Sequence, residues 1–397
     1  MTGQTRGAGA ATLRATCTPG VRAEPLILED DVWSGLDADD ADDAGPSEAL
    51  VATIQLGGRV GAMAFEGDGE HLYAAQPDSI AVINRSHLVV GRIAIPSEVK
   101  DLYLTPSTER LLAVHYAGSV SSINVVEQTV KTIASGWNSD MVFSPDSRYL
   151  YAAHNHTEVA GESVLAKIDA DGALVDSLRL PGDINALAIS PDGSELYTIS
   201  SQAGWYYQHA AGRLDVIDTD AYAVSDTIAV AADPVTVTVS PDGARLYLTH
   251  DDIAGITTIE LSTHRAVEVC LDEVPLSVTF SPDSTHAYMP HLSSLTVIDT
   301  VTLEKTRIST GELPRGVLFS PDGKRAYITN IGDHAVTVVD TVTGSVATTL
   351  AVGGNPEAMA ASPDDERLYV GDYWSGTIAV IARPSVQDEP EPSTDQA

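Results

Sequence analysis

The chain alternates hydrophobic and polar residues in short runs that end at Gly, Pro or Asp. Residues 316–352 show this clearly, with apolar runs at 316–319, 325–329, 335–340 and 346–352 separated by turns. β-Branched residues alternate with small or polar ones inside the runs, and Pro and Gly stand only in the connections, as is typical of half-buried strands. The pattern predicts four short β-strands joined by tight turns.

The same unit recurs eight times along the chain. Each copy has an apolar run, the sequence Ser-Pro-Asp-Gly or a relic of it, then Leu-Tyr or a variant and a second apolar run. The Ser position of the eight copies is occupied by Glu66, Thr105, Ser144, Ser190, Ser240, Ser281, Ser320 and Ser362. A period near 40 residues is typical of β-propeller blades. The first two copies are degenerate, so we predict an all-β propeller of eight four-stranded antiparallel blades, with seven blades as the alternative.

The last repeat is one strand short. After its signature, only the apolar runs 368–371 and 377–381 remain before a Pro-rich, acidic end. Residues 49–56, ahead of the first signature, have the pattern of an outer strand. We therefore predict that this N-terminal strand completes the last blade and hides its open edge.

Two features of these repeats resemble a known family. Leu-Tyr followed by an apolar run, and Val-Ile-Asp-Thr at 216–219 and 297–300, are similar to the YVTN family of bacterial β-propeller repeats over about residues 49–383. The resemblance implies the fold, and the family includes surface-layer proteins and lactonase-like enzymes. The whole chain also resembles mycobacterial β-propeller proteins, a likeness that implies no mechanism.

Acidic residues greatly outnumber basic ones. There are 56 Asp and Glu against 22 Lys and Arg, a formal net charge of -34. This charge repels phosphate backbones and anionic lipids, so we expect no nucleic-acid partner. Residues 1–48 and 384–397 are acidic and lack hydrophobic periodicity, so we expect two disordered tails around a propeller at 49–383. We expect a monomer that binds a protein or a small-molecule ligand on one face.

The sequence lacks the usual signals for membranes and cofactors. No apolar run is long enough for a membrane helix, and Arg6, Arg14 and Arg22 interrupt any hydrophobic core of a signal peptide. We therefore expect no membrane insertion and a cytoplasmic protein, with export by another route left open. There is no haem attachment motif, phosphate-binding Gly loop or nucleophile elbow, so no cofactor is expected to be required.

Residues that recur in every repeat are explained by the architecture, whereas a binding residue is expected to occur once. The turn aspartates are expected to cap their turns by accepting backbone N–H bonds: Asp146, Asp192, Asp242, Asp283, Asp322 and Asp364. The same role is expected for Asp169, Asp218, Asp299 and Asp340, which end third strands. The recurrent tyrosines are expected to pack between neighbouring sheets: Tyr73, Tyr151, Tyr197, Tyr247, Tyr288, Tyr327 and Tyr369.

The candidate site lies where the repeats are unequal. Insertions lengthen the connections between the second and third strands of blades 3 and 4, at 154–162 and 201–209, and these loops are expected to be neighbours on one face. Exposed aromatic rings there favour recognition, and packing under long loops is the alternative. The candidate ligand- or partner-binding residues are His115, Trp137, His154, His156, Trp205, Tyr206, Tyr207 and His209.

One short segment has the composition of a metal site. In an extended conformation His154, His156 and Glu158 point to one side, and two His with a carboxylate form a candidate set for zinc or another divalent ion. His115 and His154 also belong to a ring of polar residues that end the second strands. The alternative for that ring is that its members satisfy the backbone of the loops.

A second ring lies at the start of the innermost strands. Lys100 and Arg315 are candidates to hold a carboxylate or phosphate of a ligand, with Glu357 as a further candidate on the same ring. Ion pairing with Glu357, Glu98 or Glu312 is the alternative.

The sequence favours a non-enzymatic binding or scaffold propeller that holds its ligand or partner on the face carrying the loops of blades 2 to 4. A lactonase-like hydrolase or lyase at the mouth of the channel, with or without a divalent metal, is the alternative.

Overall fold

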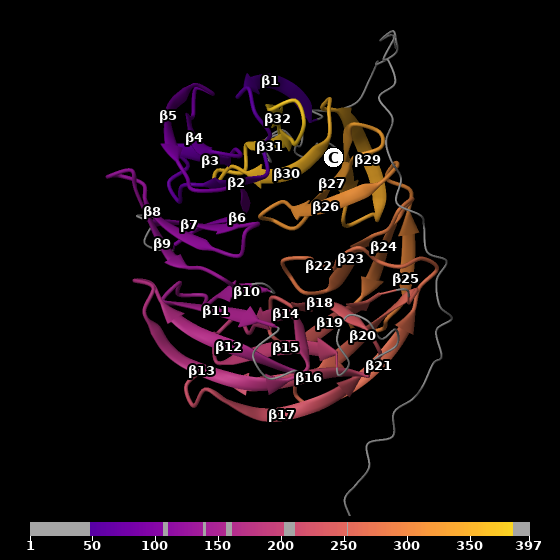
Figure 1. Cartoon of the computed structure of the whole chain (residues 1–397). Helices are drawn as coiled ribbons and strands as arrows, with labels where there is room; N and C mark the ends of the chain where they lie inside the picture. Colours follow the sequence, from indigo (N-terminus) through magenta and orange to yellow (C-terminus); the bar gives the residue numbers. More distant parts are fainter. Residues whose placement is uncertain are drawn as a thin grey trace, which may run out of the picture.

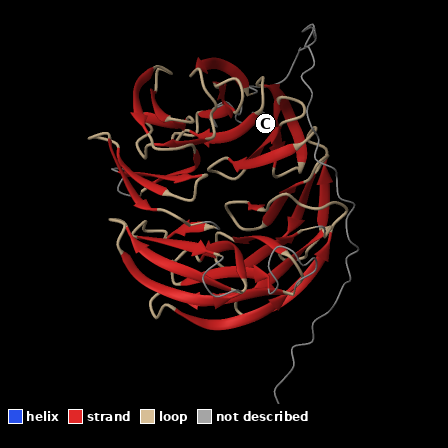
Figure 2. Cartoon of the chain, viewed as in Figure 1, coloured by secondary structure: helices blue, strands red, loops and turns tan. Residues whose placement is uncertain are grey.

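The computed structural model describes residues 48–105, 110–137, 140–155, 161–201, 211–251 and 253–383. These residues form 32 β-strands in eight four-stranded sheets, which follow one another around a ring (Figure 1). Regular structure in this part of the chain is all strand (Figure 2), so it contains no helix able to cross a membrane. The predicted eight-bladed all-β propeller is confirmed, and the seven-bladed alternative is wrong.

The strands of each blade run antiparallel from the innermost to the outermost. Blade 1 contains β2 (Ala62–Phe65), β3 (His71–Ala75), β4 (Ser79–Asn84) and β5 (Val89–Ala94). Blade 2 contains β6 (Val99–Leu104), β7 (Arg110–His115), β8 (Val120–Asn124) and β9 (Thr129–Ala134). Blade 3 contains β10 (Met141–Phe143), β11 (Tyr149–His154), β12 (Glu162–Asp169) and β13 (Leu174–Pro181). Blade 4 contains β14 (Asp183–Ile189), β15 (Glu195–Ser201), β16 (Gly212–Asp218) and β17 (Ala223–Val230). Blade 5 contains β18 (Pro234–Val239), β19 (Arg245–His250), β20 (Gly255–Glu260) and β21 (Arg265–Cys270). Blade 6 contains β22 (Thr279–Phe280), β23 (His286–Pro290), β24 (Leu295–Asp299) and β25 (Lys305–Ile308). Blade 7 contains β26 (Pro314–Phe319), β27 (Arg325–Asn330), β28 (Ala335–Asp340) and β29 (Ser345–Ala351). Blade 8 contains β30 (Pro356–Ala361), β31 (Arg367–Asp372), β32 (Thr377–Ala382) and β1 (Ala49–Gln55).

The two ends of the ring meet in blade 8. Strand β1 pairs antiparallel with β32, with Ala49 opposite Ala382 and Gln55 opposite Thr377. The N-terminal strand therefore completes the last blade, as predicted, and no three-stranded blade is left with an open edge.

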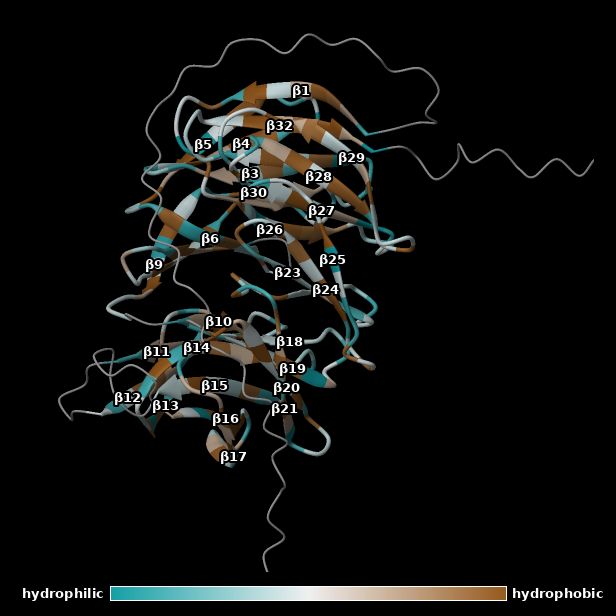
Figure 3. Cartoon of the chain, turned by 90° about the vertical axis from the view of Figure 1, so that its right-hand side faces the viewer, coloured by the Kyte–Doolittle hydropathy of each residue, from teal (hydrophilic) through white to brown (hydrophobic). Residues whose placement is uncertain are grey.

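Hydrophobic clusters fill the eight seams between neighbouring blades. The recurrent tyrosine of the second strand is only 0 to 3% exposed in the seven blades that carry it. Its ring enters the seam with the next blade: the ring centroids of Tyr369 and Phe65 are 5.1 Å apart, and those of Tyr247 and Phe280 are 4.9 Å apart. The packing role predicted for these tyrosines is confirmed, and Figure 3 shows hydrophobic residues along the strands on which the clusters lie.

The Ser-Pro-Asp-Gly turns share one hydrogen-bond pattern. In blade 4 the Ser190 hydroxyl donates to Asp192 Oδ1 at 2.6 Å and accepts the N–H of Glu195, while the Ser194 N–H donates to the same carboxylate oxygen at 3.0 Å. The pattern recurs in blades 3, 5, 6, 7 and 8. The aspartates that end third strands accept backbone N–H bonds in the same way. Both predicted sets of capping aspartates are confirmed.

This capping predicts an acid limit to stability. Hydrogen bonds from Ser190 and Ser194 lower the pKa of Asp192 from its ordinary 3.8 to about 2, and the pKa of the equivalent Asp146 and Asp364 is lowered as well. Because these folded-state pKa values lie below the unfolded ones, the carboxylates stabilise the fold above pH about 4 and lose that contribution as the pH falls toward about 2. We expect the urea midpoint to fall over this interval. A midpoint that stays constant from pH 5 to pH 2 would contradict the capping role.

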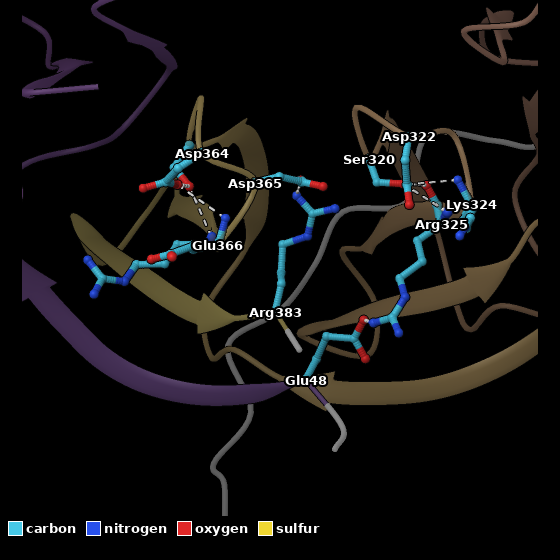
Figure 4. Close-up of polar contacts among 11 residues, drawn as sticks. Glu48, Ser320, Asp322, Lys324, Arg325, Asp364, Asp365, Glu366 and Arg383 are labelled. Carbon is cyan, nitrogen blue, oxygen red and sulfur yellow. Dashed lines mark hydrogen bonds and ion pairs between the residues drawn. The ribbon is translucent and has the colours of Figure 1, made fainter. Parts of the chain in front are cut away.

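Two ion pairs anchor the ends of the propeller (Figure 4). Glu48, just before β1, pairs with Arg325 at the start of β27, and its side chain is only 3% exposed. Arg383, just after β32, pairs with Asp365 in the blade 8 turn, is 5% exposed and lies over the Tyr327 ring. Both contacts lie where blades 7 and 8 adjoin. Glu48, which the sequence assigned to the tail, is thus a buried part of the ring closure.

Candidate functional site

The starts of the innermost strands and the connections between second and third strands lie on one face of the ring, because neighbouring strands of each sheet are antiparallel. We call this the upper face. A cavity of about 550 Å³, the upper cavity, opens on it between blades 2 and 3. Its described lining is Lys100, Asp101, Tyr103, Val114, His115, Tyr116, Ala117, Gly118, Gly136, Trp137, Asp140 and Met141. Three residues predicted to bind a ligand, Lys100, His115 and Trp137, therefore share one cavity.

A β-bulge positions Lys100. Val99 pairs with His115 and Asp101 with Val114, so Lys100 has no partner across the strand. A bulge changes the direction of its side chain. The Lys100 ammonium is 53% exposed and lies 3.9 Å from the carboxylate of Asp101, rather than pairing with the glutamates considered from the sequence.

Four other members of this ring also lie at bulges. The register skips Asn185, Val235 and Glu357 in blades 4, 5 and 8, and it skips Arg315 and its neighbour in blade 7. Five of the eight positions of the ring found in the sequence are thus described sites of irregular pairing. Arg315 and Glu357 belong to blades 7 and 8 and do not line the upper cavity.

A close backbone approach holds Trp137 at the cavity. The Trp137 N–H donates to the Gly118 carbonyl at 3.1 Å. Gly118 has a φ of +70°, and a Cβ at this position would collide with the carbonyl oxygen of Trp137. Only glycine combines this conformation with this contact, so Gly118 fixes the path of the backbone that carries the indole.

Two carboxylates face the cavity from neighbouring innermost strands. Burial raises the pKa of Asp140, and the nearby Asp101 raises it further, against the hydrogen bond that the Leu187 N–H donates to Asp140 Oδ2 at 2.8 Å. Partial burial also raises the pKa of Asp101, although Lys100 opposes the shift. A pair of carboxylates that resist ionisation in a cavity is typical of functional sites.

The histidines that end second strands hold loops in place. His115 Nδ1 bonds the Ser97 carbonyl at 2.8 Å, and its Nε2 bonds the Ser121 hydroxyl at 2.8 Å. His250 and His291 make the equivalent pair of contacts in blades 5 and 6. Both ring nitrogens of His115 are thus engaged within blade 2, which favours the loop-holding alternative for this ring.

His154 breaks this pattern. Its Nδ1 is buried and has no hydrogen-bond partner among the described residues, and its ring packs edge-to-face with that of Trp137, with centroids 6.0 Å apart. The other members of the predicted metal set, His156 and Glu158, lie outside the described residues. Within the part of the chain that is described, no three His, Cys, Asp or Glu side chains are grouped to hold a metal ion. Trp205, Tyr206, Tyr207 and His209 also lie outside the described residues.

Exposed aromatic rings lie beside the cavity and on blade 8. Tyr116 is 60% exposed and Trp374 is 62% exposed. The Arg59 guanidinium lies 5.3 Å from the ring centroid of Tyr373 and 4.7 Å from that of Trp374. The described aromatic surface therefore extends from blade 2 to blade 8, with Arg59 of blade 1 beside the blade 8 rings.

Comparison with known proteins is informative for the fold. No protein-family model and no curated protein matches the sequence. Among solved structures, the chain is similar to Kuenenia stuttgartiensis hydrazine synthase, with a TM-score of 0.54 and 21% identity over 83% of this chain and 96% of that chain. The chain is a β-propeller protein. At this identity the likeness shows the fold alone, and the resemblance to the YVTN family stays a hypothesis.

A sequence signal for Asp101 and Asp140 in this propeller was overlooked. Both stand four residues before the Ser position of their repeat, one residue after the ring that contains Lys100. The other six blades carry small or hydroxyl residues there: Ala62, Ala186, Thr236, Ser277, Gly316 and Ala358. A binding residue is expected to differ between repeats, and these carboxylates occur at this position in only two adjacent blades.

Proposed function

We propose that this propeller is a non-enzymatic binding protein whose upper cavity holds a ligand bearing an organic cation. The observation that carries the proposal is the pairing of Asp101 with Asp140 across the seam between blades 2 and 3, beside Tyr116 and Trp137 in one cavity. A concave site with a few convergent polar groups among aromatic rings is typical of ligand binding.

The charge around the cavity favours a cation. Burial raises the pKa of Tyr116, and Tyr373 and the carboxylates of Glu357, Glu98 and Asp101 raise it further. With Asp140, four carboxylates therefore stand near this mouth, and Lys100 is the cationic member of the described cavity lining. An incoming cation would stabilise the ionised form of Asp101 and Asp140, which partial burial disfavours.

The aromatic rings favour a cation with apolar substituents. Ammonium and guanidinium groups are attracted to the faces of Trp and Tyr rings, most strongly where water is excluded. The chain uses this interaction itself beside the cavity, where Arg59 lies over Tyr373 and Trp374. Tyr116 and Trp137 offer the same chemistry to a ligand.

The test uses three cations of different chemistry: choline, spermidine and arginine amide. We expect isothermal titration calorimetry to detect at least one of them, and the neutral isostere 3,3-dimethylbutan-1-ol to bind more weakly than choline. Affinity should fall as the pH is lowered through the raised pKa of Asp101 and Asp140, because protonation removes the charge that binds the cation. Absence of binding by all three cations would contradict the proposal.

The matched variants separate charge from fold. Asp140→Asn keeps an oxygen to accept the Leu187 N–H, and it should weaken binding of the cation by about tenfold or more, since hydrogen bonds and contacts to a charged group contribute about 1.5 to 3 kcal/mol. Asp176→Asn, on the exposed outer strand β13, is the control and should bind as the wild type does. Equal affinities of both variants would place the cation elsewhere.

One observation also favours the lactonase-like alternative. Two carboxylates with raised pKa values are the groups that an acid–base hydrolase requires. Turnover in a screen of lactones and esters, abolished by Asp140→Asn and retained by Asp176→Asn, would favour the hydrolase over a binding protein.

A further inference from the structure

The outer strand of blade 5 ends in a cysteine whose sulfur is bonded. Cys270 is the last residue of β21, where it pairs with Gly255 of β20 and is half-buried. Its sulfur belongs to a disulfide, and the described part of the chain contains no free cysteine. The sequence has one other cysteine, Cys17, which lies outside the described residues.

The surface beside Cys270 is basic, although the protein as a whole is strongly acidic. Lys305 of the neighbouring outer strand β25 donates from Nζ to the Cys270 carbonyl oxygen at 2.8 Å. Arg307 of the same strand is 48% exposed and pairs with Glu273. Strand β25 contains these two cations and no carboxylate, which is the largest net positive charge among the outer strands of the eight blades.

The chain between Cys17 and the first described residue has the opposite charge and sufficient length. Residues 18–47 contain nine Asp or Glu against one Arg. The segment ends at Glu48, which its ion pair with Arg325 fixes where blades 7 and 8 adjoin (Figure 4). Extended, the segment spans about 100 Å, whereas a folded chain of the size of the propeller has a radius of gyration of about 20 Å. Cys17 can therefore reach blade 5.

We propose that a disulfide between Cys17 and Cys270 straps the acidic segment 18–47 over the outer strands of blades 7 and 6 and locks the closure of the ring. Blades 7, 6 and 5 follow one another from the Glu48 anchor to Cys270 (Figure 1). The cations of β25 attract the acidic segment on this path. Because β1 follows Glu48 directly, the strap ties the closing strand to blade 5 by a covalent bond. The proposal does not depend on the organic cation of the upper cavity.

The bond forms by thiol–disulfide exchange. The thiolate of one cysteine attacks a small disulfide such as oxidised glutathione and releases one glutathione thiol, and the second cysteine then displaces the other glutathione. The two protein thiols lose two electrons and two protons, and the glutathione disulfide is reduced to two thiols. Such a bond persists in an oxidising compartment and is lost in a reducing one, so the strap is closed only in oxidising surroundings.

The test of the bond is peptide mapping of the full chain after incubation with oxidised glutathione. We expect trypsin to release the peptide 15–22 linked to the peptide 266–305, and a phosphine reductant to separate the two. Cys17→Ser should give neither the linked peptide nor any change of mobility on a non-reducing gel. Free or glutathionylated Cys17 and Cys270 after this incubation, or a dimer linked through Cys270, would overturn the proposal.

The test of the lock compares the oxidised wild type with Cys17→Ser. In the unfolded chain the bond closes a loop of about 250 residues, so the variant should melt about 2 °C or more below the wild type. Hydrogen exchange of the β1 amides should be faster in the variant, while that of β15 in blade 4 should be the same in both proteins. Thr18→Ser, which keeps both cysteines, is the control and should match the wild type. Equal melting temperatures and equal β1 exchange in wild type and Cys17→Ser would show that the segment does not lock the ring.

Discussion

Replacing Arg325 by Met is expected to lower the free energy of unfolding by about 3 to 5 kcal/mol, the loss typical of a buried ion pair from which one partner is removed. Arg325 is 35% exposed, but the Glu48 carboxylate that it pairs with is only 3% exposed. The variant therefore leaves a buried charge without its partner. Urea unfolding at pH 7 measures the loss.

The matched variants use the same logic. Glu48→Gln removes the buried charge itself and should cost less than Arg325→Met, because the arginine that remains can reach water. Arg179→Met breaks the pair of Arg179 with Glu162, whose side chains are 65% and 39% exposed, and should cost less than about 1 kcal/mol. Equal losses in Arg325→Met and Arg179→Met would show that the Glu48 contact does not contribute to ring closure.

The second large effect is expected at Gly118. Alanine at a φ of +70° costs about 1 to 2 kcal/mol, and its Cβ must also displace the carbonyl of Trp137, which adds about 1 to 3 kcal/mol. Because this contact positions the indole, Gly118→Ala should also weaken binding of the organic cation by about tenfold, a loss of about 1.4 kcal/mol. Urea unfolding and calorimetric titration report the two effects separately.

Gly344 provides the control for Gly118. It has a φ of +67° in blade 7, and no atom lies within 4 Å of a Cβ at this position. Gly344→Ala should therefore show the conformational cost alone and leave binding at the upper cavity unchanged. If the two alanine variants are equally destabilised and bind equally well, the approach of Gly118 to Trp137 does not position the site.

The upper cavity lies on the seam where the repeat is least regular. Blade 2 has Thr105 in place of the turn serine, Leu112 in place of the seam tyrosine, and Asp101 where six blades have small or hydroxyl residues. Departures from a repeat that otherwise serves packing are expected at functional positions, where stability is exchanged for a site. Asp101, one of these departures, lines the upper cavity.

The repeat in the sequence predicted eight blades, with seven as the alternative, and it predicted the four strands of each blade, the roles of the repeated Asp and Tyr residues and the strand that closes the ring. These features depend on interactions between residues near each other in the chain, such as Ser190 with Asp192, or on an edge that must be covered, as β1 covers β32. The repeat displays the turn pattern in six blades and the seam tyrosine in seven, so most copies support the same assignment.

Which side chains meet across the seams follows from the closed ring and not from the sequence pattern. Asp101 and Asp140 are 39 residues apart in the chain, Glu48 and Arg325 are 277 apart, and Arg59 reaches Trp374 because the ring closes. Leu112 and Tyr103 can be read from the sequence as departures, but the contact of the Tyr103 ring with Phe143 of blade 3 is visible only in the folded structure. Pairing of strands within a blade is set by short turns and strand register. Contacts between blades are set by the twist of each sheet and by the closure of the whole ring, and no local sequence pattern encodes these contacts.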